Sequence, residues 1–497
     1  MRLAPLLRTL GAGRAILLLA LAFGACKKDG LSPKTVRDSA VGGTADSQPA
    51  LKDTSPTPKD LSPDLSPPVK LGLSKCIEDW PSAGGPHLIK PSLTVDAPKV
   101  LWKTQHNGFQ SGNLSDAGPV LSKDRLVFQA GDWVYFINKD GTKPQTVKYG
   151  KTDYCPSGLV ADMDGNVYYT APDAVYSLDS LGKLRWSVAN GSLKLGPAGG
   201  SGCLYGLTPV FGPDGVLYAA TNDEVVRAFR ASDGKVLWSQ PAPADKYSYS
   251  RVMGGAGKAL FVAFGREHTD ALDTRDGSNL GSFVDPTLGQ SFTWDWSNWV
   301  EGWDIGIAAG RLVAFDVCGH SKWATSITRG SGVVAAGEAL VTGSKGTLIL
   351  YAADGNVAAG PAPAEGIPIA AGADGTVYTF RCDDIGMTST NRILAYSYDL
   401  KELWRLDLSA RACLGITGNV VLDDDGTMYL SRPGESTGAE IIAIQTRSPG
   451  LANSSWPSFR HDNRGTAWLV PGSPAAATDA AAAPEAKDAP IDYLPSD

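Results

Sequence analysis

The chain has 497 residues, of which 43% are hydrophobic and 20% are charged, and its formal net charge at pH 7 is −7. Nucleic-acid partners favour a basic protein face, so this acidic balance argues against one. A chain of this length ordinarily forms two or three domains, unless internal repeats build one large domain.

Residues 1–25 have the pattern of a signal peptide. Three arginines, Arg2, Arg8 and Arg14, precede an apolar run, Ala15–Phe23, that is too short to span a bilayer as a stable anchor. The run leads into Phe23-Gly24-Ala25-Cys26, which resembles a bacterial lipobox with Phe where Leu is usual. The resemblance implies that Cys26 is lipidated, and Lys27 after it favours the outer membrane. An ordinary signal peptide that happens to contain Cys26 is the alternative.

Residues 26–75 are predicted to be a disordered tether. They are almost free of aromatic and β-branched residues and repeat Leu-Ser-Pro. Such a segment cannot bury enough apolar surface to offset the entropy lost on ordering. The Ala-, Pro- and Asp-rich tail 471–497 is predicted to be disordered for the same reason, which leaves residues 76–470 as the folded domain.

The stretch Leu204–Trp238 shows the unit that this domain repeats. Asp-Gly and Asn-Asp pairs separate β-prone runs, and Asp-Gly favours hairpins because Gly accepts the positive φ of the turn. Four short strands in about 40–45 residues match the length of a propeller blade. The predicted strands are Thr208–Phe211, Val216–Ala220, Val225–Phe229 and Lys235–Trp238.

The inner hairpin of this unit recurs along the chain, and the outer strand recurs with a closing Trp at Trp186, Trp238 and Trp404. The copies of the inner hairpin are Ser122–Ala130, Asp162–Tyr169, Gly212–Ala220, Gly255–Phe264, Ala308–Phe315, Ala335–Gly343, Gly372–Phe380 and Asp423–Leu430. The second strands near Arg311 and Ala339 are unusually close, so seven blades are the alternative to eight. The sequence predicts an all-β, eight-bladed β-propeller of four-stranded antiparallel blades.

The pattern resembles the PQQ-like β-propeller repeat, whose blades end in a motif like A-L-D-x-x-T-G-K-x-x-W. The resemblance covers about Val95 to Thr466 and implies the fold, not a function. Lys99–Lys103 (KVLWK) reads as an isolated fourth strand, and Cys413–Gln445 supplies three strands without a fourth. We therefore expect Lys99–Lys103 to complete the last blade and to remove free sheet edges. Trp456–Thr466 is expected to pack near this closure.

The cysteines indicate an oxidising compartment. Apart from Cys26 there are six, an even number that favours disulfides in an exported chain. Cys155 and Cys203 precede the first strands of consecutive blades, so we expect them to pair. Cys382 and Cys413 belong to the last two blades and form the second expected pair, which leaves Cys76 with Cys318. Free buried thiols are the alternative.

No catalytic residue, metal site or bound cofactor is predicted. PQQ-dependent dehydrogenases that resemble this fold commonly have two adjacent cysteines and a Glu/Asn/Asp calcium set, and neither can be placed here. Gly434–Gly438 matches G-x-S-x-G but joins two strands of a blade rather than a strand and a helix. Asp162, Asp164 and Asn166 have the spacing of a calcium loop, but an ordinary Asp-Gly turn is the favoured interpretation.

One stretch is not explained by the repeat. Four tryptophans crowd between Phe292 and Asp304 with acidic residues among them: Trp294, Trp296, Trp299 and Trp303. Tryptophan is enriched at binding hot spots, so this stretch is a candidate binding site. The alternative is blade packing, for which the repeat also uses Trp.

The sequence therefore favours a monomeric, lipid-anchored propeller at the cell envelope that binds or scaffolds protein partners without catalysis. Two alternatives stay open. One is a PQQ-dependent dehydrogenase, and the other is a carbohydrate- or peptidoglycan-binding module based on the tryptophans.

Overall fold

The computed structural model divides the chain into two units. Met1–Asp60 lies outside the described residues, and Leu61–Asp497 contains every described strand. The structure describes residues 72–73, 90–95, 97–106, 118–130, 133–150, 158–171, 173–189, 208–221, 223–242, 250–264, 268–283, 297–300, 303–308, 311–315, 321–326, 332–336, 339–344, 347–352, 354–385, 388–410, 420–433, 439–452, 458, 462–464 and 467–469. Within this part there is no helix long and apolar enough to cross a membrane.

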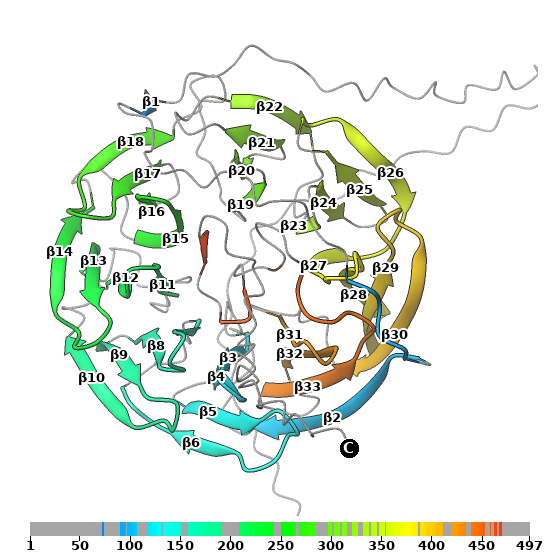
Figure 1. Cartoon of the computed structure of the whole chain (residues 1–497), viewed down its shortest axis with the longest axis horizontal. Coiled ribbons are helices and arrows are strands. Elements are labelled where there is room, and N and C mark those ends of the chain that lie inside the picture. Colours follow the sequence, from blue (N-terminus) through cyan, green and yellow to red (C-terminus); the bar gives the residue numbers. More distant parts are fainter. Residues whose placement is uncertain are drawn as a thin grey trace, which may run out of the picture. The chain divides into compact units, whose positions relative to one another are not determined.

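The described strands form eight sheets, each of which is one blade of a ring (Figure 1). In each blade the first strand lies innermost and the fourth outermost, as the sequence predicts. The blades of the first half of the ring are listed in chain order. Blade 1 is β3 (Val120–Ser122), β4 (Arg125–Ala130), β5 (Trp133–Asn138) and β6 (Gln145–Val147). Blade 2 is β7 (Val160–Ala161), β8 (Val167–Thr170), β9 (Ala174–Leu178) and β10 (Leu184–Ala189). Blade 3 is β11 (Val210–Phe211), β12 (Val216–Ala220), β13 (Val225–Arg230) and β14 (Val236–Pro241). Blade 4 is β15 (Ser250–Ala256), β16 (Ala259–Phe264), β17 (His268–Asp273) and β18 (Asn279–Phe283).

The second half of the ring repeats this order. Blade 5 is β19 (Ser297–Val300), β20 (Trp303–Ala308), β21 (Arg311–Phe315) and β22 (Ser321–Ser326). Blade 6 is β23 (Gly332–Ala336), β24 (Ala339–Ser344), β25 (Thr347–Tyr351) and β26 (Val357–Pro363). Blade 7 is β27 (Ile367–Ala371), β28 (Val377–Ile385), β29 (Thr388–Tyr396) and β30 (Glu402–Ala410). Blade 8 is β31 (Val421–Leu422), β32 (Thr427–Pro433), β33 (Ala439–Gln445) and the N-terminal strand β2 (Lys99–His106).

The predicted closure is confirmed. β2 pairs antiparallel with β33, from Lys99 opposite Gln445 to His106 opposite Ala439. The first strand of the folded domain thus becomes the outermost strand of its last blade. Closing the ring in this way joins two parts of the chain that are far apart in sequence, and it leaves blade 8 as complete as its neighbours.

The predicted strand order within blade 5 is wrong. Ala308–Phe315 was expected to contain the first hairpin of its blade, but Arg311 opens the third strand, β21. The first hairpin is β19–β20, which comes from the Trp-rich stretch. The apparent crowding of two blades near Arg311 and Ala339 therefore has a simple cause, because a third strand had been compared with a second strand.

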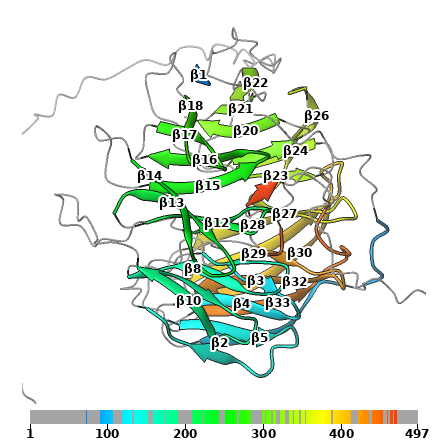
Figure 2. The same ribbon diagram turned by 60° about the vertical axis from the view of Figure 1, so that its left-hand side comes forward.

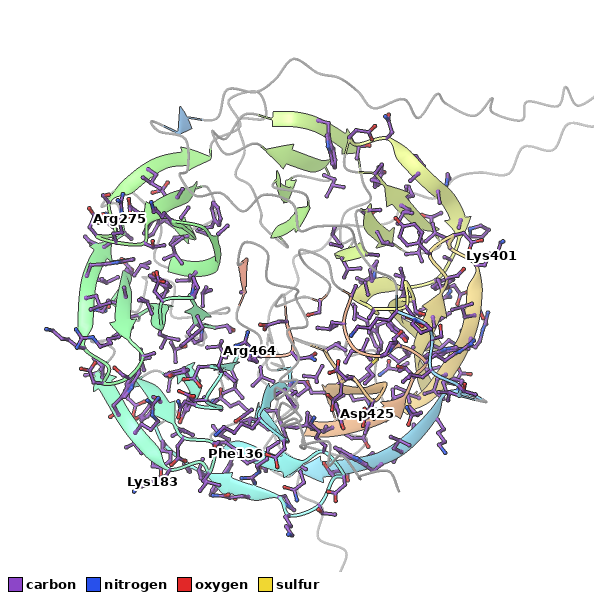
Figure 3. The ribbon with its side chains drawn as sticks, viewed as in Figure 1. Phe136, Lys183, Arg275, Lys401, Asp425 and Arg464 are labelled. Carbon is purple, nitrogen blue, oxygen red and sulfur yellow. The ribbon has the colours of Figure 1, made fainter. Side chains whose placement is uncertain are left out.

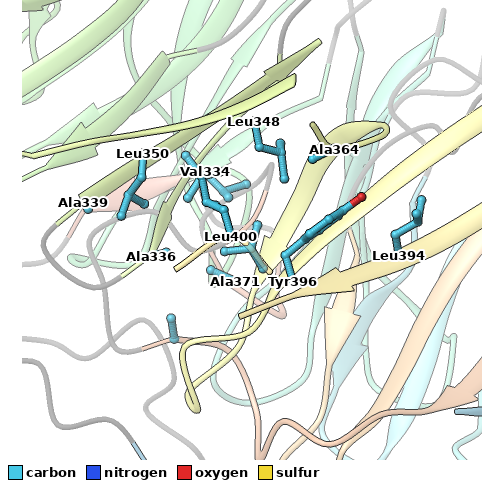
Figure 4. Packing of buried hydrophobic residues seen from close by; sticks show 13 residues of the cluster. Val334, Ala336, Ala339, Leu348, Leu350, Ala364, Ala371, Leu394, Tyr396 and Leu400 are labelled. Carbon is cyan, nitrogen blue, oxygen red and sulfur yellow. The ribbon is translucent and has the colours of Figure 1, made fainter. Parts of the chain in front are cut away.

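Apolar side chains of the second and third strands fill the spaces between blades. Figure 4 shows the cluster between blades 6 and 7, where Val334, Leu348 and Leu350 meet Tyr396 and Leu400. Successive residues of a strand point to opposite faces, so each blade contributes alternate residues to two such clusters. Close packing on both faces is what makes the short strands of this repeat stable together.

The segment after β33 runs along the innermost strands. The N–H of Ala452 donates to Ala371 of β27, and that of Leu121 of β3 donates to Asn463. The side chain of Asn463 also pairs with both backbone groups of Leu422 of β31, at 2.9 Å each. Figure 3 labels Arg464 of this segment near the centre of the ring. This agrees with the expectation that Trp456–Thr466 packs near the closure.

Two short strands extend blade 4 into a six-stranded sheet. β34 (Trp468–Leu469) pairs in parallel with the innermost strand β15 (Figure 2), and β1 (Gly72–Leu73) pairs with the outermost strand β18. β1 comes from the end of the predicted tether. The other residues of that tether, the signal peptide and the predicted tail lie outside the described residues.

The antiparallel order gives the ring two different edges. Connections from first to second and from third to fourth strands leave one edge, here called the turn edge. Connections from second to third strands and between blades leave the other, here called the loop edge. Several turn-edge connections are Asp-Gly turns such as Asp233-Gly234, whereas the loop-edge connections follow no common motif. Function tends to be carried by such variable loops on a rigid frame.

Candidate binding surface at the loop edge of blades 7 and 8

The turn edge is occupied by contacts that hold the blades together. Trp186 of β10 lies against Gly234 of blade 3, where an added Cβ would be 2.8 Å from the indole. Its indole N–H donates to the carbonyl of Ala231 of blade 3 at 2.8 Å. The same bond joins Trp238 to Thr274 of blade 4 and Trp102 to Lys139 of blade 1. Each such Trp therefore fastens its blade to the next through the glycine of a turn.

Turn-edge carboxylates are mostly used within their own turns. The Asp233 carboxylate accepts from the N–H of Lys235, and that of Asp354 accepts from the N–H of Asn356. Hydrogen bonds from Ser278 hold the pKa of Asp276 below its ordinary value. Asp162 accepts from Asn166 and from the Tyr168 hydroxyl of the same hairpin, as expected of an ordinary turn rather than a calcium loop. These groups stabilise turns, which favours the loop edge as the binding surface.

Blade 7 has the longest of the described strands, and they extend toward the loop edge. β28, β29 and β30 each have nine residues, and they remain paired up to Ile385 opposite Thr388. First strands and outer strands in other blades are as short as two or three residues. The extra residues of blade 7 therefore form a small projecting sheet whose two faces are directed toward blades 6 and 8.

The face of this sheet toward blade 6 carries an ionic network. Glu365, which follows β26, accepts from Arg381 Nη1 at 2.5 Å and lies 3.8 Å from Arg392 Nη1. Arg392 Nε donates to Asp407 at 2.6 Å. The backbone of Glu365 is fixed in turn, since its N–H donates to the Tyr396 hydroxyl and its carbonyl accepts from Thr379. Burial raises the pKa of Tyr396, so this hydroxyl is neutral at physiological pH.

The face toward blade 8 carries a second set of polar groups, here called the polar layer: Asn391, Arg432 and Glu440. Ile393, Leu430 and Ile442 belong to the apolar cluster between blades 7 and 8. Asn391, Arg432 and Glu440 lie two residues beyond them toward the loop edge, on the same faces of their strands. The polar layer is therefore the next layer of this boundary after its apolar core.

The polar layer is deeply buried. Asn391 is 2% exposed, and the side chains of Arg432 and Glu440 are 3% and 2% exposed. Arg432 Nε donates to Glu440 Oε2 at 2.6 Å, and Lys103 Nζ of β2 lies 3.7 Å from Glu440 Oε1. Burying a charge pair costs several kcal/mol per ion in desolvation, so such pairs add little net stability. Asn391 Oδ1 has no hydrogen-bond partner among the described residues.

Neither side-chain set has the composition of a catalytic centre. The groups are arginines, carboxylates and an amide, without a nucleophile next to a base. The described residues hold no group of three or more His, Cys, Asp or Glu that could bind a metal. What the surface can do is recognise a partner through charge and hydrogen bonds.

Most of the site residues predicted from the sequence lie outside the described residues. This holds for Cys26, Trp294, Trp296 and the cysteines at 76, 155, 203, 318 and 413. Of the predicted disulfide residues, Cys382 has a described backbone, in β28 opposite Asn391. Trp299 and Trp303 have described backbones in β19 and β20, where Trp299 pairs with Asp304 and Trp303 with Val300. The Trp-rich stretch is thus part of the blade repeat, and its binding role stays a prediction.

Sequence analysis did not identify the polar layer or the ionic network. Both consist of ordinary charged and amide residues in strand segments that lie beyond the repeat. The one available signal was the alternation of β32 and β33, in which Arg432 and Glu440 occupy positions that Leu430 and Ile442 predict to be buried. Trp323 of blade 5 was also missed, although it packs on Gly355 of blade 6 as Trp186 does on Gly234.

Comparison with known proteins gives one family match, which covers part of the chain. Residues 94–284 match the PQQ repeat family model described as outer membrane protein assembly factor BamB. No curated protein matches the chain.

Solved structures are similar at low identity. BamB from Moraxella catarrhalis has a TM-score of 0.48 and 12% identity, over 70% of this chain and 100% of that one. Quinohemoprotein alcohol dehydrogenase from Comamonas testosteroni has a TM-score of 0.49 and 12% identity, over 74% of this chain and 81% of that one. The computationally designed Ika8 protein has a TM-score of 0.46 and 12% identity, over 68% and 99%. All three scores are below 0.5.

Proposed function

Because residues 94–284 match the PQQ repeat family model, we propose that this protein is a non-catalytic module that binds protein partners at the cell envelope. The family description, an outer membrane assembly factor, supports a protein partner and an outer-membrane or periplasmic setting. The proposed binding surface is the loop edge of blades 7 and 8.

The observation that carries this proposal is the difference between the two edges. Turn-edge groups are used to fasten blades and to stabilise turns. On the loop edge, blade 7 projects a sheet that carries a charged network on one face and a buried polar layer on the other. Interfaces favour arginine, and complementary charge sets register and association rate. A projecting, partly exposed set of this kind suits a protein partner.

We also propose that Cys26 is lipidated and that Cys155–Cys203, Cys382–Cys413 and Cys76–Cys318 form disulfides. A lipid anchor followed by a long tether would keep the propeller at the membrane while leaving its edges free to meet partners. Disulfides would be expected in the oxidising compartment that such an anchor implies.

Photo-crosslinking in intact cells tests the proposed surface. A photoreactive residue would replace Asp407 of blade 7 or Lys103 of blade 8, which are exposed on the loop-edge half of their strands, with Lys401 and Leu181 at the turn edge as controls. The side chain of Asp407 is 58% exposed and that of Lys401 80%, so both sites are open. We expect discrete protein adducts from the loop-edge sites. Adducts from the turn-edge sites alone, or from neither edge, would contradict the proposal.

The alternatives have direct tests of their own. Saturable binding of PQQ with calcium, followed by dye reduction, would replace the scaffold with a quinoprotein dehydrogenase. Binding to purified peptidoglycan that is lost in a Trp299→Ala variant would favour the carbohydrate-binding alternative.

A further inference from the structure

We propose that the outer edge of β30 in blade 7 binds an extended segment of the partner protein as an added antiparallel strand, with a basic residue opposite Asp407 and an acidic residue opposite Arg405. This inference rests on the proposed function, because it specifies how blade 7 recognises a protein. Three observations support it: a long free sheet edge, a strand already added to an outer edge of this ring, and two charged side chains with unused atoms.

β30 is the longest outermost strand that the structure describes. It has nine residues, and it ends the sheet of blade 7 at the rim of the ring (Figure 1). No described strand pairs with its outer side. Such an edge presents a row of main-chain N–H and C=O groups that a further strand can pair with.

The next longest outer strands are protected against such pairing. β2 has eight residues and carries Lys99 and Lys103, and β26 has seven residues and contains Pro361 and Pro363. Lysine and proline are the residue types with which native proteins keep sheet edges free. β30 contains neither residue type, so its edge is the one most open to an added strand.

The same ring already carries an added strand on an outer edge. β1 pairs antiparallel with β18, the outermost strand of blade 4, with Gly72 opposite Ser282 and Leu73 opposite Gly281. β1 is far from blade 4 in sequence, so it joins this sheet as a separate segment. The outer edge of a blade in this ring therefore accepts an extended segment in the antiparallel orientation, which is also slightly the more stable one per residue.

Arg405 and Asp407 give this edge its charge pattern. They lie two residues apart on one face of β30, and their side chains are 51% and 58% exposed. Arg405 donates to Glu402 through Nε and Nη2, and Asp407 accepts from Arg392 through Oδ1. These bonds leave Nη1 of Arg405 and Oδ2 of Asp407 for a strand added at the edge. Residues directly opposite each other on antiparallel strands attract when their charges are opposite and repel when they are alike.

These positions define the partner segment. In an antiparallel strand the residue opposite Asp407 comes two positions before the residue opposite Arg405. The residue between them faces Leu406, which packs against the apolar cluster between blades 7 and 8, so an apolar side chain fits there. The segment therefore reads, in chain order, Lys or Arg, then an apolar residue, then Asp or Glu.

Two synthetic peptides of equal composition test the inference: Thr-Val-Lys-Leu-Glu-Val-Thr and its charge-exchanged form Thr-Val-Glu-Leu-Lys-Val-Thr. Binding of each to the purified protein is measured by fluorescence anisotropy. We expect the first peptide to bind about fivefold more tightly, because two facing charge pairs become repulsive with the second. N-methylation of one alternate set of amides in the first peptide should abolish binding, since only that set donates to β30, and methylation of the other set should not.

Exchanging the charges of the protein should reverse the preference. The variant combines Arg405→Asp with Asp407→Arg, and we expect it to bind the second peptide more tightly than the first. The control combines Asp399→Lys with Lys401→Asp, which exchanges another exposed ion pair of blade 7 at the turn edge and should leave the preference unchanged. The measured quantity is the ratio of two affinities for one sample, so it does not depend on the fraction of the variant that is folded.

The contradicting outcomes are distinct. Equal affinities, no binding of either peptide, or a preference that the exchanged variant retains would overturn the inference and leave the proposed function intact. A second copy of this chain offers the same charge pattern in its own β30, although the formal net charge of −7 on each copy opposes that pairing. An in-cell adduct at position 407 that joins two copies of this chain would therefore also overturn the inference. If neither loop-edge position gave an adduct, the proposed function itself would fail, and this inference with it.

Discussion

At the scale of single residues, one tryptophan per outer strand decides how blades are joined. Trp186 combines ring packing on a glycine with an indole hydrogen bond to the next blade. Trp404 packs on Tyr378 as Trp186 packs on Tyr168, but its indole N–H has no acceptor among the described residues. The two side chains are both partly buried, so they offer a comparison in which the hydrogen bond is the main difference.

Replacing each by Phe should separate these contributions. Trp186→Phe loses a satisfied hydrogen bond and leaves the Ala231 carbonyl without its donor, whereas Trp404→Phe removes a donor that had no acceptor. We expect Trp186→Phe to lower the free energy of unfolding by about 1–2 kcal/mol more than Trp404→Phe does. Chemical denaturation of the two purified variants measures the difference. Equal losses would mean that Trp404 has an acceptor in solution.

At the scale of strands, the ring is closed at both its outer and its inner side. β2 closes the outer side by pairing with β33. Asn463 closes the inner side, since its side chain bonds to Leu422 of blade 8 and its carbonyl accepts from Leu121 of blade 1 at 2.7 Å. The residue thus joins the innermost strands of the first and last blades, which are far apart in sequence.

Asn463→Ala should therefore destabilise the whole ring. Two hydrogen bonds to the backbone of Leu422 are lost, and we expect the free energy of unfolding to fall by about 1–3 kcal/mol. The control is Asn356→Ala in the exposed turn of blade 6, where the loss should stay near 0.5 kcal/mol. If both variants unfolded at the same denaturant concentration, the hydrogen bonds between Asn463 and Leu422 would contribute nothing to stability.

The predicted link between blades 7 and 8 can be examined at the same scale. Non-reducing peptide mapping should recover Cys382 joined to Cys413, and the bond should contribute about 3–4 kcal/mol in the chain-entropy description. Recovery of Cys382 as a free thiol would refute this pair. A pairing of Cys155 with any cysteine other than Cys203 would refute the first one.

The sequence allowed the blades and the closure to be predicted because Asp-Gly turns and the KVLW strand are local signals. The prediction for blade 5 is wrong because its first hairpin, β19–β20, lacks that turn signal. The sequence pattern therefore points to the next hairpin, β20–β21. The polar layer could not be predicted, since burial of Asn391, Arg432 and Glu440 depends on which blade faces which. Trp404 is similar, because its sequence motif is intact and yet its indole N–H has no acceptor among the described residues.

At the scale of the whole protein, membrane anchoring and partner recognition are assigned to different parts of the chain. The described part of Leu61–Asp497 forms the ring, and Cys26 is the proposed attachment point. Cys26→Ala should move the protein from the membrane fraction to the soluble fraction, because the lipid is the proposed anchor. Fractionation with immunodetection measures this, and unchanged membrane association would contradict the anchor without affecting the ring.

The central claim is that partners bind at the loop edge of blades 7 and 8. Hydrogen exchange with mass spectrometry tests it most directly, by comparing the purified protein with the complex isolated from the envelope through a tag on this chain. The account predicts slower exchange in the complex for peptides that cover residues 381–393 and 403–410. It predicts no change for the turn-edge peptides that cover 372–376 and 397–401. Protection confined to the turn edge, or absent from both sets in a complex that contains a partner, would contradict the claim.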